Sequence, residues 1–124
     1  MVSPTHFIPQ IKQALELAKN KGLTIPVVYN TNAYEKTESL KLLEGLIDIY
    51  LPDFKYISTE YSKYSNAPDY AEYAKKAILE MKRQQPEMIF ENGILKKGII
   101  IRHLILPGCY KDSFEILKWI KQNI

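Results

Sequence analysis

The sequence predicts an α/β fold in which parallel strands alternate with amphipathic helices. Short apolar runs are separated by segments whose apolar residues recur at helical spacing, so helix and strand alternate along the chain. The strand-like runs are apolar at nearly every position, which is typical of strands that are covered on both faces. These two observations favour a parallel sheet with helical crossovers.

The chain opens on a polar turn at residues 1–4, with no strand before it. A helix is expected over residues 8–20, because Pro9 suits a first turn and Gly22 supplies a stop. Its apolar positions fall on one face, as expected of a helix that packs on a sheet.

Two strands and a short helix follow. Residues 23–29 are expected to form a strand, in which Pro26 is tolerated only near the start or at a sheet edge. The turn at residues 30–33 leads into a helix over residues 37–44, and residues 46–51 form the second strand.

The second half of the chain adds a long loop, a helix and a hairpin. Residues 57–68 exceed a simple connection and suggest a lid, although a solvated loop is the commoner role for such a segment. Asp69 is expected to cap a helix that ends at Gln84 and that buries a stripe of Tyr70, Ala74, Ala77, Ile78 and Met81. Residues 88–96, turning at Asn92-Gly93, read as a small β-hairpin insertion.

The last elements are the clearest apolar strand, residues 98–106, and a helix over residues 112–122 that is expected to bury Ile116, Leu117 and Ile120. Three main strands do not close a barrel, which needs about eight in the usual (β/α) form. We therefore expect residues 1–124 to form one partial, TIM-like (β/α) half barrel, with outer helices and open strand edges.

Composition excludes several classes of protein. The 17 basic and 14 acidic residues are spread along the chain, without the basic patch that nucleic-acid binding needs. The single cysteine excludes an internal disulfide and a multi-cysteine metal site. Neither a membrane span nor a secretion signal is visible, so a cytoplasmic location without membrane contact is expected.

Polar residues stand at the ends of the expected strands. Asp53 and Lys55 are two residues apart and can face one site, and ligands bind at the carboxyl ends of strands in such folds. The alternative for this pair is a surface ion pair worth about 0–1 kcal/mol. Arg102 lies inside an apolar strand and needs a polar cavity or a partner.

His103 alternates to the other face from Arg102 and is expected to be structural. His6 and Cys109 are better explained by capping or packing than by chemistry. We therefore predict no catalytic residue and no metal ligand in this chain.

Four segments together resemble the later part of the barrel in radical S-adenosylmethionine enzymes, in particular the group of pyruvate formate-lyase activating enzyme. They occur in the family order and cover residues 2–110. The segments are Val2-Ser3-Pro4-Thr5, resembling the Gly-Gly-Glu-Pro turn; Tyr29-Asn30-Thr31-Asn32-Ala33-Tyr34, resembling Asp-Thr-Asn-Gly-aromatic; Asp48-Ile49-Tyr50-Leu51-Pro52-Asp53-Phe54-Lys55, resembling the strand end Leu-Asp-Leu-Lys; and Ile101-Arg102-His103-Leu104-Ile105-Leu106-Pro107-Gly108, resembling Arg-Tyr-Val-Val-Val-Pro-Gly.

The resemblance implies S-adenosylmethionine as the cofactor, bound by this part of an enzyme that makes a 5′-deoxyadenosyl radical for hydrogen abstraction. A glycyl-radical enzyme or another protein substrate would be the partner. Ser3 and Asn30 replace acidic residues of the family, in a region where related enzymes can hold a monovalent cation. The implied cofactor-binding residues are Ser3, Pro4, Thr5, Asn30, Thr31, Asn32, Asp53, Lys55 and Arg102.

The family binds a [4Fe-4S] cluster through Cys-x-x-x-Cys-x-x-Cys, and three thiolates are needed to hold it. This chain has only Cys109, so the cluster is expected on an N-terminal segment that this chain lacks, and the chain alone is expected to be inactive. The alternative is an inactive remnant or a protein-binding module that uses the same half barrel. In either case the open edges of the half barrel are expected to favour self-association or a completing partner.

Overall fold

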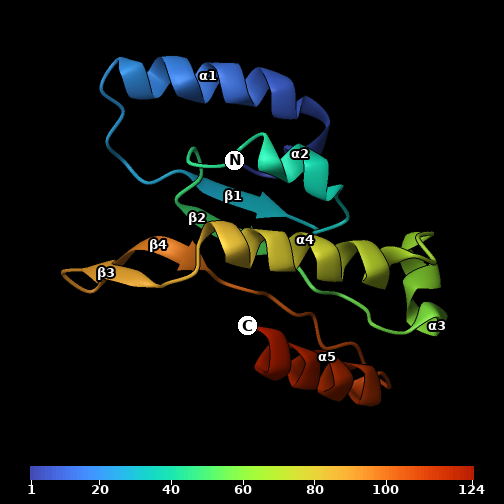
Figure 1. The fold of residues 1–124 in the computed structure, drawn as a ribbon. Coiled ribbons are helices and arrows are strands. Elements are labelled where there is room, and N and C mark those ends of the chain that lie inside the picture. The colour runs from blue at the N-terminus through green and yellow to red at the C-terminus, as the bar shows by residue number, and fades with distance from the viewer.

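A computed structural model describes residues 1–124, and its elements follow the alternation expected from the sequence (Figure 1). The helices are α1 (Ile8–Asn20), α2 (Thr37–Lys41), α3 (Thr59–Ser62), α4 (Tyr70–Gln84) and α5 (Tyr110–Asn123), with 3-10 turns η1 (Thr5–Phe7) and η2 (Lys63–Ser65). The strands are β1 (Val28–Thr31), β2 (Ile49–Pro52), β3 (Ile89–Glu91) and β4 (Ile94–Ile99).

The four strands form one open sheet in the order β1-β2-β4-β3. The pairs β1–β2 and β2–β4 are parallel, which confirms the prediction of three adjacent parallel strands. Their ladder continues past the strand ends, because Arg102 N–H donates to the Pro52 carbonyl at 2.9 Å and Phe54 N–H donates to the Arg102 carbonyl at 2.8 Å. The sheet is mostly parallel and open, and it does not close into a barrel.

The first residues also join the sheet, contrary to the expected turn without a strand. Asn30 N–H donates to the Met1 carbonyl at 3.0 Å, and Ser3 N–H donates to the Asn30 carbonyl at 2.8 Å. Val2 thereby forms a parallel bridge with Asn30, on the edge of β1 that faces away from β2. The segment is too short to show a strand pattern, so its pairing is evident only from the neighbouring strand β1.

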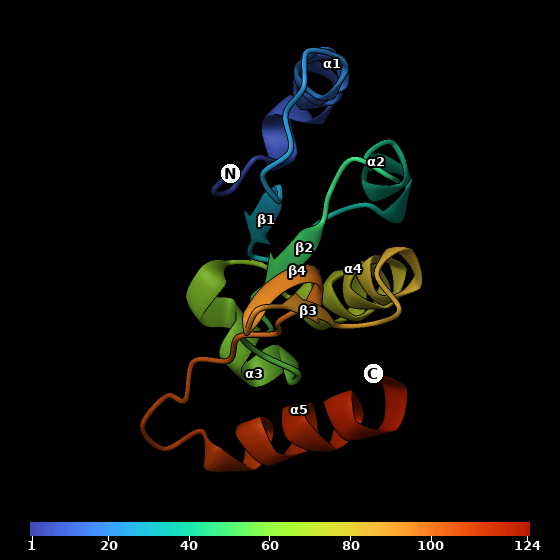
Figure 2. The same ribbon diagram turned by 90° about the vertical axis from the view of Figure 1, so that its left-hand side faces the viewer.

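Helices α1, α2, α4 and α5 form an outer arc around the strands, whereas the other side of β1 and β2 carries no such layer (Figure 2). The core lies between this arc and the sheet. Tyr29 and Tyr50, on adjacent strands, are fully buried there and meet edge to face with ring centroids 5.8 Å apart. The expected buried stripe of α4 is confirmed at Tyr70, Ala74, Ala77, Ile78 and Met81.

Side chains alternate across the sheet. Tyr50, Pro52 and Phe54 of β2 and its extension point to the helices and are buried, whereas Leu51 and Asp53 point to the other face and are partly exposed. That second face is the uncovered face. Ile100 and Arg102 lie on it in the extension of β4, both exposed.

Several expected boundaries were wrong. The strand expected over residues 23–29 begins only at Val28, since Pro26 lacks an amide hydrogen and Ile25 is exposed. The strand expected over residues 98–106 ends at Ile99, apart from the bridge of Arg102 to Asp53. Beyond this bridge no strand is available to pair with the chain, and Leu104 and Ile105 are exposed rather than buried.

Other corrections concern packing and pairing. The hairpin turning at Asn92-Gly93 is confirmed, but it is not separate from the third parallel strand: β4 pairs antiparallel with β3 and then parallel with β2. The loop at residues 57–68 contains α3 and η2. Asp69 precedes α4 as expected, yet its carboxylate makes no capping bond and accepts the Tyr34 hydroxyl at 2.6 Å. Leu117 is exposed, contrary to prediction, because no element covers that side of α5.

Candidate functional site

Three of the residues singled out from the sequence meet at the carboxyl ends of the parallel strands. Arg102 Nε donates to Asp53 Oδ1 at 2.8 Å, and Arg102 Nη2 donates to Asn30 Oδ1 at 2.8 Å. Nη2 also lies 2.7 Å from Asp53 Oδ1. The three side chains come from β1, the end of β2 and the extension of β4, and together they form what we call the strand-end cluster, Asn30, Asp53 and Arg102.

Their common location follows from strand alternation and register. Asn30 is paired with Leu51, two residues before Asp53, and Asp53 is paired with Arg102. Residues two apart on a strand share a face, so all three point to the uncovered face. The partner of Arg102 is thus Asp53. This agrees with the expectation from the sequence that an arginine within an apolar run needs a partner or a polar cavity.

The cluster remains accessible and has unused hydrogen-bonding capacity. The side chains of Arg102 and Asp53 are 47% and 24% exposed. Asp53 Oδ1 takes both contacts from the guanidinium, so Asp53 Oδ2 has no protein partner. Lys55 makes no side-chain hydrogen bond or ion pair, and its ammonium is also unpaired within the chain. The charged pair expected from the sequence, Asp53 with Lys55, is therefore replaced by Asp53 with Arg102.

Three other predicted site residues, Ser3, Pro4 and Asn32, have different surroundings. Ser3 is joined to Asn30 through the backbone, with a left-handed φ of 48°. Pro4 is buried and precedes η1. Asn32 is exposed, and its Oδ1 accepts the Tyr34 N–H at 3.0 Å, so its side chain stabilises the turn after β1.

Thr5 and Thr31 belong to a second polar group on the helix-covered side, built around Glu35. The Tyr29 hydroxyl donates to Glu35 Oε2 at 2.8 Å, and the Thr31 hydroxyl donates to Glu35 Oε1. Glu35 is only 2% exposed. Burial, followed by the adjacent Glu35 carboxylate, raises the pKa of Tyr29, with Thr5 opposing this by a hydrogen bond. The structure does not bring Thr5 or Thr31 to the uncovered face with the strand-end cluster.

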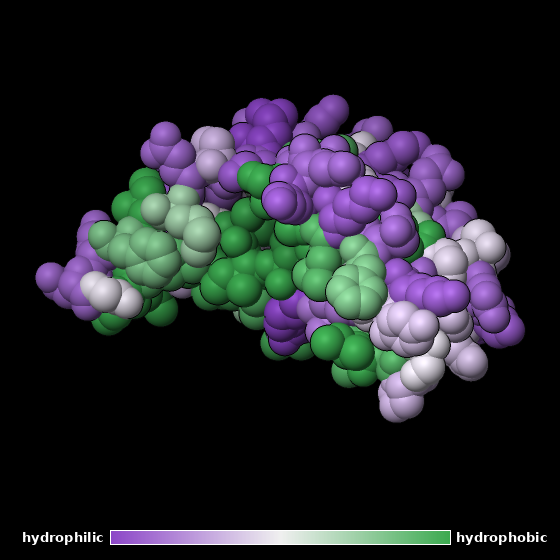
Figure 3. Space-filling view, turned by 90° about the horizontal axis from the view of Figure 1, so that it is seen from below, coloured by the Kyte–Doolittle hydropathy of each residue, from purple (hydrophilic) through white to green (hydrophobic).

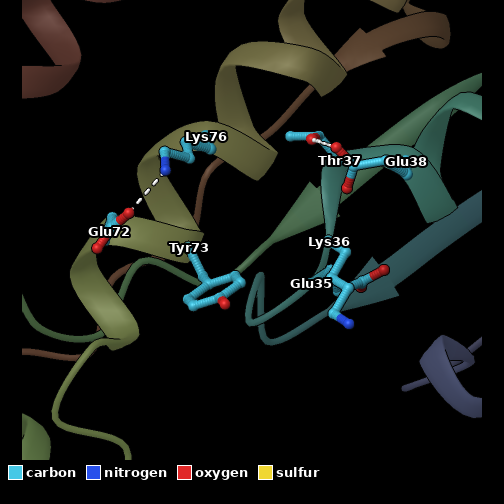
Figure 4. Close-up of a pocket in the computed structure, with 7 residues that line it drawn as sticks. All are labelled: Glu35, Lys36, Thr37, Glu38, Glu72, Tyr73 and Lys76. Atoms are coloured by element: carbon cyan, nitrogen blue, oxygen red, sulfur yellow. Dashed lines mark hydrogen bonds and ion pairs between the residues drawn. The ribbon is translucent and has the colours of Figure 1, made fainter.

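Glu35 was missed by sequence reasoning because it stands in a polar turn among other acids and bases, where burial leaves no local signal. It also lines a groove of about 280 Å³ between the start of α2 and α4 (Figure 4). Two polar contacts lie there: Lys76 Nζ is 2.6 Å from Glu72 Oε1, and the Thr37 hydroxyl donates to Glu38 Oε1 at 3.2 Å. We assign no ligand to this groove.

His103 and Cys109 have structural surroundings. His103 lies with Nδ1 2.7 Å from the Phe54 carbonyl oxygen and Nε2 2.8 Å from Ser113 Oγ. The carbonyl oxygen can only accept, so Nδ1 carries a hydrogen, and His103 ties the extension of β4 to α5. Cys109 is buried, and its Sγ lies 3.7 Å from the Pro107 carbonyl oxygen.

The fold and the cluster define a mixed α/β protein with a polar group at the carboxyl ends of its parallel strands. The chain is 33% identical over 117 residues to Uncharacterized protein MJ0674 of Methanocaldococcus jannaschii. That alignment covers 90% of this chain and 30% of the relative, so the chain spans less than a third of the length of the protein it matches. No protein-family model matches the chain, and no solved structure matches it.

Two further findings bear on ligands and membranes. No three His, Cys, Asp or Glu side chains gather closely enough to hold a metal ion. No helix has both the length and the apolar character needed to cross a bilayer.

Proposed function

We propose that this chain positions S-adenosylmethionine within a radical S-adenosylmethionine enzyme that resembles pyruvate formate-lyase activating enzyme, as part of a larger (β/α) barrel. The observation that carries the proposal is the meeting of Asn30, Asp53 and Arg102 at the carboxyl ends of three adjacent parallel strands. Ligands bind at this end of the strands in both barrels and open parallel sheets.

The groups left free by the protein suit a zwitterionic ligand. Lys55 can pair with the carboxylate of the methionyl part, and the planar guanidinium of Arg102 can share it. Asp53 Oδ2, which no protein group uses, can accept from the ligand ammonium or from a ribose hydroxyl. These charges sit on the uncovered face, so a ligand reaches them without displacing a helix.

The iron–sulfur cluster of the family does not fit this chain. Cluster ligation needs three thiolates, and the chain has one cysteine, which is buried at the start of α5. Its proposed role is therefore limited to holding and orienting the ligand, and a glycyl-radical enzyme or other protein substrate would be engaged only by the complete enzyme.

The test is a titration of the 15N-labelled chain with S-adenosylmethionine, followed by amide shifts. We expect shifts at residues 30–32, 53–55 and 102, and Lys55→Ala is expected to weaken binding by about 10- to 150-fold, the equivalent of one charge-assisted contact of about 1.5–3 kcal/mol. Lys118→Ala, which removes the same charge from the exposed side of α5, should leave affinity unchanged.

His103→Ala is a second control, since it should lower stability through the lost bonds to Phe54 and Ser113 while leaving affinity largely intact. Equal affinity for Lys55→Ala and the wild type would remove Lys55 from the site. A wild-type chain whose amides do not respond to S-adenosylmethionine would overturn the proposal.

A second candidate, a binding module without catalytic function, is favoured by exposed apolar side chains. Met88, Ile89, Phe90 and Ile94 of the β3–β4 hairpin are 53%, 42%, 58% and 61% exposed. Figure 3 shows apolar surface over the hairpin and between it and α5. Such patches on a strand edge are typical of association surfaces.

Sedimentation velocity tests the hairpin as an association surface. A module that self-associates through this hairpin should show concentration-dependent mass, which Phe90→Lys on the exposed hairpin abolishes. A compact monomer at every concentration would exclude self-association and would also count against the half barrel, whose open strand edges predict association.

A further inference from the structure

The hydroxyl of Tyr70 connects the ends of β1 and β2 at the point where the candidate site residues follow them. Its oxygen accepts the Lys55 N–H at 3.0 Å. The same hydroxyl lies 2.9 Å from the Asn32 carbonyl oxygen and 2.8 Å from the Asp53 carbonyl oxygen, between which its single hydrogen is shared. One side-chain atom therefore contacts both strand-end turns.

Tyr70 is well placed to hold these turns because it is itself fixed. It is the first residue of α4 and is 3% exposed. Its ring packs edge to face on Tyr56 with centroids 5.7 Å apart, and it lies tilted against the ring of Tyr34 with centroids 6.1 Å apart. Burial raises the pKa of Tyr70, so the hydroxyl stays protonated and able to donate.

The backbone groups that Tyr70 contacts have no substitute. The Lys55 N–H has no acceptor other than this hydroxyl, because the parallel ladder ends with the Phe54 N–H. The hydroxyls of two other buried tyrosines behave differently: Tyr29 donates to the Glu35 carboxylate and Tyr50 to Gln84 Oε1, both side chains on the helix-covered side.

We propose that Tyr70 is a positioning residue, which sets the turn at residues 30–32 and the turn at residues 53–55 relative to each other so that Lys55 and the strand-end cluster face one ligand. This inference rests on the proposed function. Tyr70 does not touch the ligand; it acts through the backbone of Asn32, Asp53 and Lys55. Packing alone would need only the ring, so the role resides in the hydroxyl oxygen.

Tyr70→Phe tests the role, because it keeps the ring and removes that oxygen. Tyr50→Phe is the matched control, since it removes an equally buried hydroxyl whose bond to Gln84 lies away from the strand ends. Two quantities are measured on each variant and on the wild type: hydrogen exchange of the Lys55 amide, and affinity for S-adenosylmethionine. Circular dichroism confirms that both variants are folded.

We expect Tyr70→Phe to speed exchange of the Lys55 amide and to weaken binding, each by about 3- to 10-fold, the range for one ordinary hydrogen bond. Tyr50→Phe should change stability without either effect. Unchanged exchange at Lys55 would show that the hydroxyl does not order the turn, and would overturn the inference whatever the ligand does.

The remaining outcomes are also distinguishable. Faster exchange at Lys55 with unchanged affinity would reduce Tyr70 to a structural role, while Lys55→Ala still reports on the proposed site. A wild-type chain that binds no S-adenosylmethionine would overturn the proposed function and with it the positioning role, and the exchange data would then assign the hydroxyl to stability alone.

Discussion

The attachment of the C-terminal helix depends on one buried carboxylate, and its removal should be costly. Asp112, in the first turn of α5, is 6% exposed. It accepts the Ile57 N–H at 3.0 Å and the Ser58 N–H at 2.8 Å. Each hydrogen bond to a charged group is worth about 1.5–3 kcal/mol, so loss of both in Asp112→Ala should lower the free energy of unfolding by about 3–6 kcal/mol. Domains of this size are stable by only about 5–15 kcal/mol in total.

Urea unfolding followed by two probes measures this loss. The single tryptophan, Trp119 of α5, packs edge to face on Phe54 with centroids 5.3 Å apart, so its fluorescence reports docking of the helix, whereas circular dichroism reports the whole chain. Asp112→Asn keeps one acceptor oxygen and should lose about 1.5–3 kcal/mol. Glu115→Ala is the control, because this residue lies three positions further along α5 on its exposed side. Its free energy of unfolding should stay within about 0.5 kcal/mol of the wild-type value. An Asp112→Ala midpoint equal to that of Glu115→Ala would refute the reasoning.

Two further predictions concern stability. Hydrogen bonds from Arg83 hold the pKa of Glu80 and the pKa of Glu44 below the usual 4.5. A lowered folded pKa stabilises the protein above the unfolded value, so this contribution should be lost as pH falls below 4.5, and Arg83→Met should flatten the dependence of melting temperature on pH there; an equally steep profile in the variant would contradict this. Gly98 has φ of 142°, and an added Cβ would lie 3.2 Å from Met88 Cγ, so Gly98→Ala should cost about 1–3 kcal/mol by chemical unfolding. Gly108→Ala is the control for backbone strain alone, because Gly108 has φ of 80° but open space around an added Cβ. An equal loss of stability in the two variants would exclude a steric contribution at Gly98.

Much of the candidate site was visible in the sequence for a simple reason. Strand ends in a parallel sheet lie at one edge, and alternation fixes the face, so Asn30, Asp53 and Arg102 could be expected together once three strands were recognised. Thr5 and Thr31 could not be placed, because the buried Glu35 that engages Thr31 is set by the turn after β1 and by the packing of α2. No local pattern marks a buried glutamate in a polar segment.

Tyr70 illustrates a different limit. Its spacing with Ala74, Ala77 and Met81 predicts a buried helical position, and that prediction was correct. Periodicity describes where a ring lies and says nothing of where its hydroxyl points. The three backbone contacts of that oxygen arise only when α4 crosses the ends of β1 and β2.

The sequence by itself determined the class of fold, the helices α1 and α4, the hairpin turn and the parallel order of the strands, because apolar periodicity, Gly and Pro positions and short connections act locally. Tertiary structure alone decided where the pairing between strands starts and stops along the chain. Met1–Ser3 becomes a strand-like edge only because β1 offers free backbone groups, and residues 103–106 stay unpaired because no neighbour does. It also decided that Asp53 pairs with Arg102 rather than with Lys55, since that choice depends on register between strands distant in the sequence.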